Sequence, residues 1–314
     1  MLTTTVSHAP ITRTDTARGR YYTILDRVTG ESVRYPSVTS ILGVINKPAL
    51  VPWAAKEERL AVSETAADLY ADLHGSTQLP RSMFLTTLEH RLGKTKAHVK
   101  ALAKAAEIGS AVHAKIEWTL KRALGQRIGA EPVLTEAALW GFMAWEDWAK
   151  AIALQPQAIE QTVYSRTHAY AGTMDLSATL DAGALLGVLE RQGAVDASVG
   201  DWLRTRATVT ALIDFKTGKA VYPEAHLQSV AYQRALAEMG HGRVDGGLIV
   251  RLPKVTTDPG FEVAVVPPAR EVFPTFLACR QLWAWQQAQA DGTAARTRST
   301  VQSVTAFASS SRNL

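Results

Sequence analysis

Residues 212–233, LIDFKTGKAVYPEAHLQSVAYQ, join an apolar segment that carries two opposite charges to a segment of helical character. Side chains alternate between the two faces of a β-strand, so Asp214 and Lys216 share one face and Phe215 points to the other. We expect Ile213 and Phe215 to pack in the core while the two charges point outward together. The stretch is either an ion pair at the edge of a sheet or part of a reactive centre.

The helix predicted at 223–240 begins with a proline and ends with a glycine, residue types that favour those two positions. Gln228 and Tyr232 lie four residues apart and therefore share one face of this helix. A strand followed closely by a helix can place that face beside the end of the strand. An Asp-x-Lys pattern alone occurs by chance in many proteins, so its weight depends on what surrounds it.

The surrounding sequence predicts a mixed central β-sheet flanked by helices, an α/β fold. Beside a strand at 208–216, further strands are expected at 158–165, 170–180, 245–254 and 261–268, and helices at 134–154 and 270–290. Trp140, Trp145 and Trp148 in the first of these helices are expected in the core. Residues 181–207 are rich in glycine and charge, and we interpret them as a loop or an insertion.

The N-terminal third is organised differently from this core. We expect a disordered N-terminus at 1–18, a hairpin and mainly helical region at 19–97, the core at 98–291 and a flexible tail at 292–314. The hairpin covers 20–36 and turns at Thr29-Gly30, a helix opens behind Ser37, and a loop falls at 75–81 within an otherwise helical stretch.

The composition excludes several classes of protein. Of 314 residues, 46% are hydrophobic and 20% charged, which is typical of a globular domain. No apolar run is long enough for a transmembrane helix, and the N-terminus lacks the features of a secretory signal. The one cysteine, Cys279, excludes a disulfide framework or a cysteine-bound metal cluster and favours a cytoplasmic setting. The chain has no phosphate-binding GxxxxGK[ST] loop and is therefore not by itself a motor or helicase.

Positive charge is concentrated in one window. The chain has a net charge of +5, whereas residues 81–127 contain ten Lys or Arg and three Glu, giving +7. Such a window is either a solvated helical face or a surface that follows a phosphate backbone.

Three separated polar positions could form a metal site. His113 lies beside the apolar stripe of a helix near 98–124, with Glu117 one turn later, and Asp175 interrupts a strand of small and apolar residues. Each has an ordinary explanation, a structural histidine or a solvent-facing carboxylate. His113 and Asp175 provide, together with Asp214, two carboxylates and an imidazole, a set suited to Mg²⁺ or Mn²⁺. Such a metal would polarise a phosphate and activate water, and Lys216 could assist.

Four motifs in this order resemble the PD-(D/E)XK nuclease superfamily, in its RecB-like branch with a Gln-x-x-x-Tyr helix. They are GSAVHAKIE at 109–117, GTMD at 172–175, IDFKTGK at 213–219 and QSVAYQ at 228–233. The resemblance covers about 109–240, and the leader at 35–54 is similar to that of phage-encoded members.

This resemblance implies a restriction-endonuclease-like core whose active site lies where the strands carrying Asp175 and Asp214 diverge. It implies roles for the matching residues: metal ligation by His113, Asp175, Asp214 and the carbonyl of Phe215, catalysis by Lys216, and bracing of the site and contact with DNA by Gln228 and Tyr232. Glu160 falls where many members keep an acid and ranks second, and Glu117 ranks lower still.

The implied function is a Mg²⁺- or Mn²⁺-dependent DNA exonuclease in phage recombination, repair or DNA processing, located in the host cytoplasm. A structure-selective endonuclease and a non-catalytic DNA-binding assembly protein are the alternatives. DNA is the implied partner, a recombination or single-strand annealing protein is a further candidate, and no membrane is involved. The four-cysteine iron–sulfur cluster of several RecB-like exonucleases cannot form here. Polarity, strand preference, processivity and oligomeric state stay open.

Overall fold

The computed structural model describes residues 11–25, 29–73, 80–242, 244–258 and 260–310, with side chains as far as residue 292. Its centre is a five-stranded sheet in the order β4-β5-β6-β7-β8, in which β6 and β7 run parallel and the other neighbours antiparallel. The strands are β4 (Gln155–Ser165), β5 (Tyr170–Asp181), β6 (Thr208–Lys216), β7 (Gly246–Arg251) and β8 (Glu262–Val265). This confirms the predicted α/β fold with a mixed central sheet.

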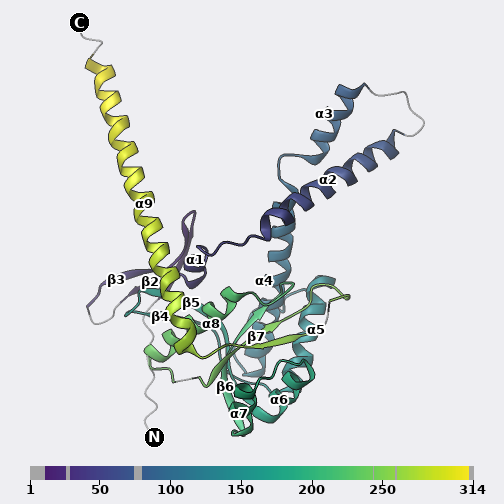
Figure 1. Ribbon diagram of the computed structural model, residues 1–314, viewed down its shortest axis with the longest axis vertical. Helices are drawn as coiled ribbons and strands as arrows, with labels where there is room; N and C mark the ends of the chain where they lie inside the picture. The colour runs from purple at the N-terminus through teal and green to yellow at the C-terminus, as the bar shows by residue number, and fades with distance from the viewer. Residues whose placement is uncertain (1–10, 26–28, 74–79, 243, 259, 311–314) are drawn as a thin grey trace.

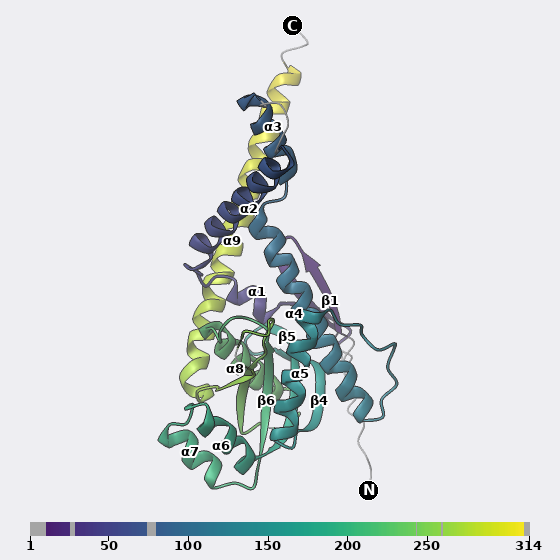
Figure 2. The ribbon, with the colours of Figure 1, turned by 90° about the vertical axis from the view of Figure 1, so that its right-hand side faces the viewer.

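Helices cover both faces of this sheet (Figures 1 and 2). One face packs in a core with α4 (Ala97–Ala123), α5 (Glu136–Ala151), α6 (Ala182–Arg191) and α7 (Ala197–Arg204). The other packs in a second core with α1 (Val38–Leu42), α8 (Pro223–Glu238) and the first turns of α9 (Ala269–Ser310). The expected tryptophan core is confirmed for Trp145 and Trp148, which are buried, whereas Trp140 is half-buried. Because both faces are covered, a polar side chain on β6 must find a partner or a cavity.

Residues 181–207, which we expected to be a loop or an insertion, are not a loop. They form α6 and α7, and each helix is capped by an aspartate, Asp181 accepting from Ala184 N at 2.7 Å and Asp196 from Val199 N at 2.8 Å. Leu185 and Leu189, four residues apart, pack in the core. The glycines and charges of this segment suggested irregular structure. The aspartate N-caps and the helical spacing of the apolar residues instead favour two helices.

The N-terminal sheet is larger than the predicted hairpin. The hairpin is confirmed as β2 (Gly19–Leu25) and β3 (Ser32–Pro36), and β1 (Ile11–Thr16) pairs antiparallel with β2. Residues 11–16 are therefore ordered in a strand, contrary to the expectation for 1–18, because β2 supplies the hydrogen-bonding edge that their Thr-rich sequence can use. Residues 1–10 lie outside the described part. Tyr22 and Tyr35 of this sheet pack against Ala171 of β5.

Two helical elements project beyond the sheet core on the same side (Figure 1). One is the hairpin of α2 (Leu50–Asp72) and α3 (Arg81–Leu92), in which Leu69 is the one buried residue among those described. The predicted loop at 75–81 falls largely on residues 74–79, outside the described part. The other is α9, whose backbone stays helical to Ser310, past residue 292 where we expected a flexible tail. No described helix has the length and apolar character needed to cross a membrane.

Candidate metal centre

The candidate site lies where β5 and β6 separate. Their ladder ends at the pair Leu176–Ile213, and Asp175 and Phe215 follow just beyond it. On its other edge β6 continues beside β7, where the carbonyl of Lys216 accepts from the backbone of the neighbouring loop at 2.7 Å. The N–H of Phe215 therefore has no strand partner on the β5 side and donates to Asp175 Oδ2 at 2.8 Å.

The regular alternation of side chains is interrupted at Asp175. Met174 packs in the core beneath α8, whereas Leu176, two residues later, packs in the core beneath α4. In a regular strand these two side chains would share a face. Across the sheet, between the partners of these two residues, Glu160 has a φ of 47°. A residue other than glycine adopts this conformation at a cost of about 1–3 kcal/mol, and such strain is concentrated at functional sites.

His113 approaches this point from α4, where Val112 and Ile116 are buried and orient the helix. Its Nε2 lies 3.1 Å from the carbonyl oxygen of Phe215, and its Nδ1 lies 3.6 Å from Asp175 Oδ2. A carbonyl can only accept, so Nε2 carries the proton, and in the neutral ring Nδ1 keeps its lone pair facing Asp175. A metal-binding histidine typically has this arrangement, with the second ring nitrogen donating to a carbonyl.

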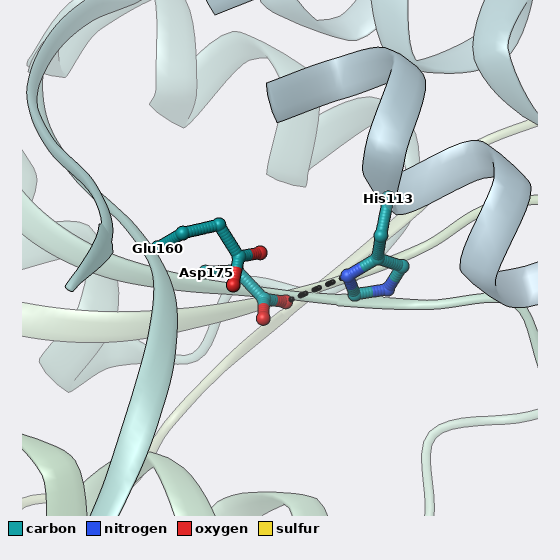
Figure 3. Close-up of side chains that lie close together, drawn as sticks. All are labelled: His113, Glu160 and Asp175. Carbon is teal, nitrogen blue, oxygen red and sulfur yellow. Dashed lines mark ion pairs between the residues drawn. The ribbon is translucent and has the colours of Figure 1, made fainter. Parts of the chain in front are cut away.

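His113, Glu160 and Asp175 form the cluster shown in Figure 3. One ligand atom from each lies within 4.8 Å of the other two, and all three side chains are partly accessible. Two carboxylates and an imidazole at this spacing fit a small divalent cation. The cluster brings together His113 and Asp175, the two residues that the resemblance implies as metal ligands, with Glu160, which the sequence ranked second.

The pKa of Glu160 is strongly shifted by this environment. Burial, and then the negative charges of Asp175 and Glu117, raise the pKa of Glu160 from 4.5 to about 7. Glu117, the weakest candidate, thus acts near the cluster rather than in it, and its carboxylate pairs with Lys121 one turn later. The sequence feature that could have ranked Glu160 higher was its position opposite Asp175 in the predicted antiparallel pair of strands.

Asp214 lies on the opposite face of β6 from Phe215, and the expectation that it points outward is wrong. It is 1% exposed, because α8 covers that face of the strand. Its Oδ2 and Oδ1 lie 2.6 Å and 2.8 Å from Lys216 Nζ, and Oδ1 accepts from Gln228 Nε2 at 2.9 Å. Lys216 also donates to Gln228 Oε1 at 3.3 Å. The predicted strand pair and helix residue therefore do meet.

Two features of Asp214 bear on metal binding. Burial raises its pKa to about 6, although the charge of Lys216 opposes the rise and that of Asp175 adds to it. Burial alone would lower the pKa of Lys216, but the charges of Asp214 and Asp175 outweigh it and the net direction is upward. Despite the short ion pair, Asp214 Oδ2 makes no well-directed hydrogen bond within the described residues. Asp214 stands beside the cluster and is not one of its three grouped ligands.

Two motif glycines allow close approaches around the site. A Cβ on Gly172 would lie 2.4 Å from a ring carbon of Tyr232, and a Cβ on Gly109 would lie 2.8 Å from Thr217 Oγ1. Tyr232 is 3% exposed, and burial raises its pKa well above the ordinary value. The ring of Tyr232 on α8 therefore packs closely against β5 at Gly172 and is buried.

No protein-family model matches the chain, and no curated protein matches it in sequence.

Proposed function

We propose that the chain is a Mg²⁺- or Mn²⁺-dependent deoxyribonuclease of the PD-(D/E)XK type, acting as an exonuclease in phage DNA recombination or repair in the host cytoplasm. The observation that best supports this is the approach of His113, Glu160 and Asp175 to one another within 4.8 Å. They come from a helix and two strands. The next strand carries an ion pair between the buried Asp214 and the partly exposed Lys216.

The donor set fits the proposed metal. His113 Nδ1 and the carboxylates of Asp175 and Glu160 would hold it, with the Phe215 carbonyl and Asp214 next to them. The metal would supply Lewis-acid polarisation of a phosphate and a bound water of lowered pKa. The carbonyl of Phe215 fixes the tautomer and the ring orientation of His113 through the 3.1 Å contact. The amide of the same residue orients Asp175.

Lys216 is the residue that we assign to the reacting phosphate. Its side chain is 32% exposed, and its ammonium is held by Asp214 and Gln228. Hydrogen bonds of this kind preorganise a cation, so that little reorientation is needed as negative charge develops on phosphate oxygens. Its raised pKa keeps it cationic at neutral pH, which favours electrostatic stabilisation over proton abstraction.

The experiment compares linear and covalently closed circular DNA with Mg²⁺, Mn²⁺ or EDTA. Loss of linear DNA alone supports an exonuclease, and nicking of circles would instead identify an endonuclease of the same chemistry. Asp175→Asn and Asp214→Ala should abolish cleavage, whereas Asp147→Asn, an exposed carboxylate on α5, should not. Absence of metal-dependent cleavage contradicts the proposal and leaves a non-catalytic DNA-binding role. Full activity in Asp214→Ala contradicts the assignment of the catalytic residues.

A further inference from the structure

One face of α4 runs along the ends of two parallel strands. Ala105, Gly109 and His113 are spaced by four residues and so lie on one side of the helix. The His113 contact with Phe215 is at the end of β6. Gly109 faces Thr217, one residue past that strand, and its missing side chain makes room for the threonine hydroxyl.

The third contact on this face involves Lys254, which the proposed chemistry does not use. Its Nζ donates to the carbonyl of Ala105 at 3.0 Å. Lys254 follows β7 by three residues, and the last residue of β7 pairs with Lys216. Its own backbone N–H donates to Asp258 Oδ2 at 3.2 Å, which fixes the loop. Lys254 is thereby held at the same end of the sheet as the catalytic candidates.

The ammonium of Lys254 has bonding capacity to spare. It has three N–H donors, and the Ala105 carbonyl uses one. Within the described residues, the carboxylate whose charge acts most on this ammonium is that of Asp258, and the two groups form no ion pair within 4.0 Å. A half-buried lysine with two donors available, at the same end of the sheet as the proposed nuclease site, is suited to bind a phosphate.

The charged residues on and just before α4 indicate the direction in which a bound polyanion would extend. On the Ala105 side of His113, residues 94–112 contain one acidic residue, the exposed Glu107, and four exposed lysines, Lys94, Lys96, Lys100 and Lys104. On the other side the first charged residues that follow are Lys115 and Glu117, each in an ion pair. A polyanion should therefore extend from the metal centre toward the N-terminal end of α4.

We propose that Lys254 is a positioning residue that binds a backbone phosphate of the DNA away from the scissile bond. Eight residues of helix separate Ala105 from His113, a rise of about 12 Å. That length corresponds to roughly three or four nucleotides at about 3.4 Å each. The inference rests on the proposed nuclease function, because it takes the DNA strand to start at the metal centre.

The test uses full-length protein and short DNA with Ca²⁺ for binding and Mg²⁺ for cleavage. Lys254→Gln should weaken DNA affinity by on the order of three- to tenfold, lower the salt dependence by about one phosphate and leave kcat nearly unchanged. Lys254→Arg should retain most of the affinity. The matched control is Lys150→Gln, an exposed lysine in the last turn of α5. This turn lies far from the metal centre, because the carbonyl of the nearby Ile152 accepts from the N–H of Asp181, at the opposite end of the β5–β6 ladder.

Single methylphosphonate substitutions identify the phosphate. Neutralising one phosphate about three or four nucleotides from the scissile bond should weaken DNA binding by the wild type. The same substitution should not weaken DNA binding by Lys254→Gln any further. The inference is overturned if each neutralised phosphate weakens DNA binding equally in both proteins, or if Lys254→Gln has the salt dependence of the wild type. Either result counts even if the wild type cleaves DNA. Lys254-dependent binding without cleavage would support the inference and contradict the nuclease proposal. A wild type that neither binds nor cleaves DNA overturns both.

Discussion

Replacing Glu160 with glutamine changes how the free energy of unfolding depends on pH. The folded protein holds the pKa of this carboxyl near 7, above its ordinary value of 4.5. Below about pH 4.5 the group is protonated in both the folded and the unfolded state and does not lower the free energy of unfolding. As pH rises from there through about 7, the unfolded state loses its proton more readily, so the folded wild type becomes progressively less stable. Glutamine keeps the shape of the side chain and removes this cost.

The magnitude follows from the pKa change. A rise from 4.5 to about 7 corresponds to at most about 3.4 kcal/mol at about 1.36 kcal/mol per pKa unit, and partial solvent access reduces this to about 1–3 kcal/mol. In EDTA, Glu160→Gln should therefore gain about 1–3 kcal/mol of unfolding free energy relative to the wild type between about pH 5 and about pH 8.5. Adding Mn²⁺ at the higher pH should stabilise the wild type more than the variant, since the variant lacks one carboxylate ligand.

Urea unfolding at the two pH values measures the difference, with Glu107→Gln as a control for loss of an exposed carboxylate on α4. The charge of Asp214 also varies in this range but is present in both proteins and largely cancels. A difference between variant and wild type that stays constant within about 0.5 kcal/mol from low to high pH would refute the assigned environment of Glu160.

Two other predictions concern the support of the site. Gly172→Ala places a Cβ against the buried ring of Tyr232 and should cost about 1–3 kcal/mol in urea unfolding. Gly187→Ala in α6, where the nearest atom is a flexible arginine tip at 3.5 Å, should instead gain up to about 1 kcal/mol; equal effects would contradict the close approach. Lys216→Met leaves Asp214 buried and unpaired, so it should cost about 1–3 kcal/mol at high pH. The cost should be smaller near pH 5, where Asp214, with a pKa of about 6, is protonated; a cost independent of pH would count against the buried pair.

The parts of the fold that were predictable are those in which local signals agree. The alternation in residues 208–216 and the Pro and Gly limits of the next helix predict β6 and α8, and the structure contains both. The four-residue spacing of Gln228 and Tyr232 also predicts their common face. The meeting of His113 with Asp175 required the family resemblance, because no local pattern relates a helix to a strand sixty residues away.

The remaining features depend on tertiary geometry. The burial of Asp214 follows from α8 covering β6, which strand alternation alone does not reveal. The arrival of Glu160 in the cluster depends on a left-handed backbone conformation in the middle of β4, a feature without a residue-type signal at a glutamate. In residues 181–207, glycine content outweighed the cap and spacing signals, although both were present in the sequence.

The peptide group of Phe215 has a consequence for genetic analysis of this protein. Its amide and carbonyl hold Asp175 and His113, whereas its ring packs in the core beneath α4, with its centroid 6.2 Å from that of the His113 ring. Substituting the ring with another large apolar side chain leaves both contacts in place, so scanning mutagenesis would score this position as a packing residue. Only a backbone change, such as replacing the amide with an ester, would expose its part in the centre. The position can therefore vary among apolar residues while its main-chain role stays the same.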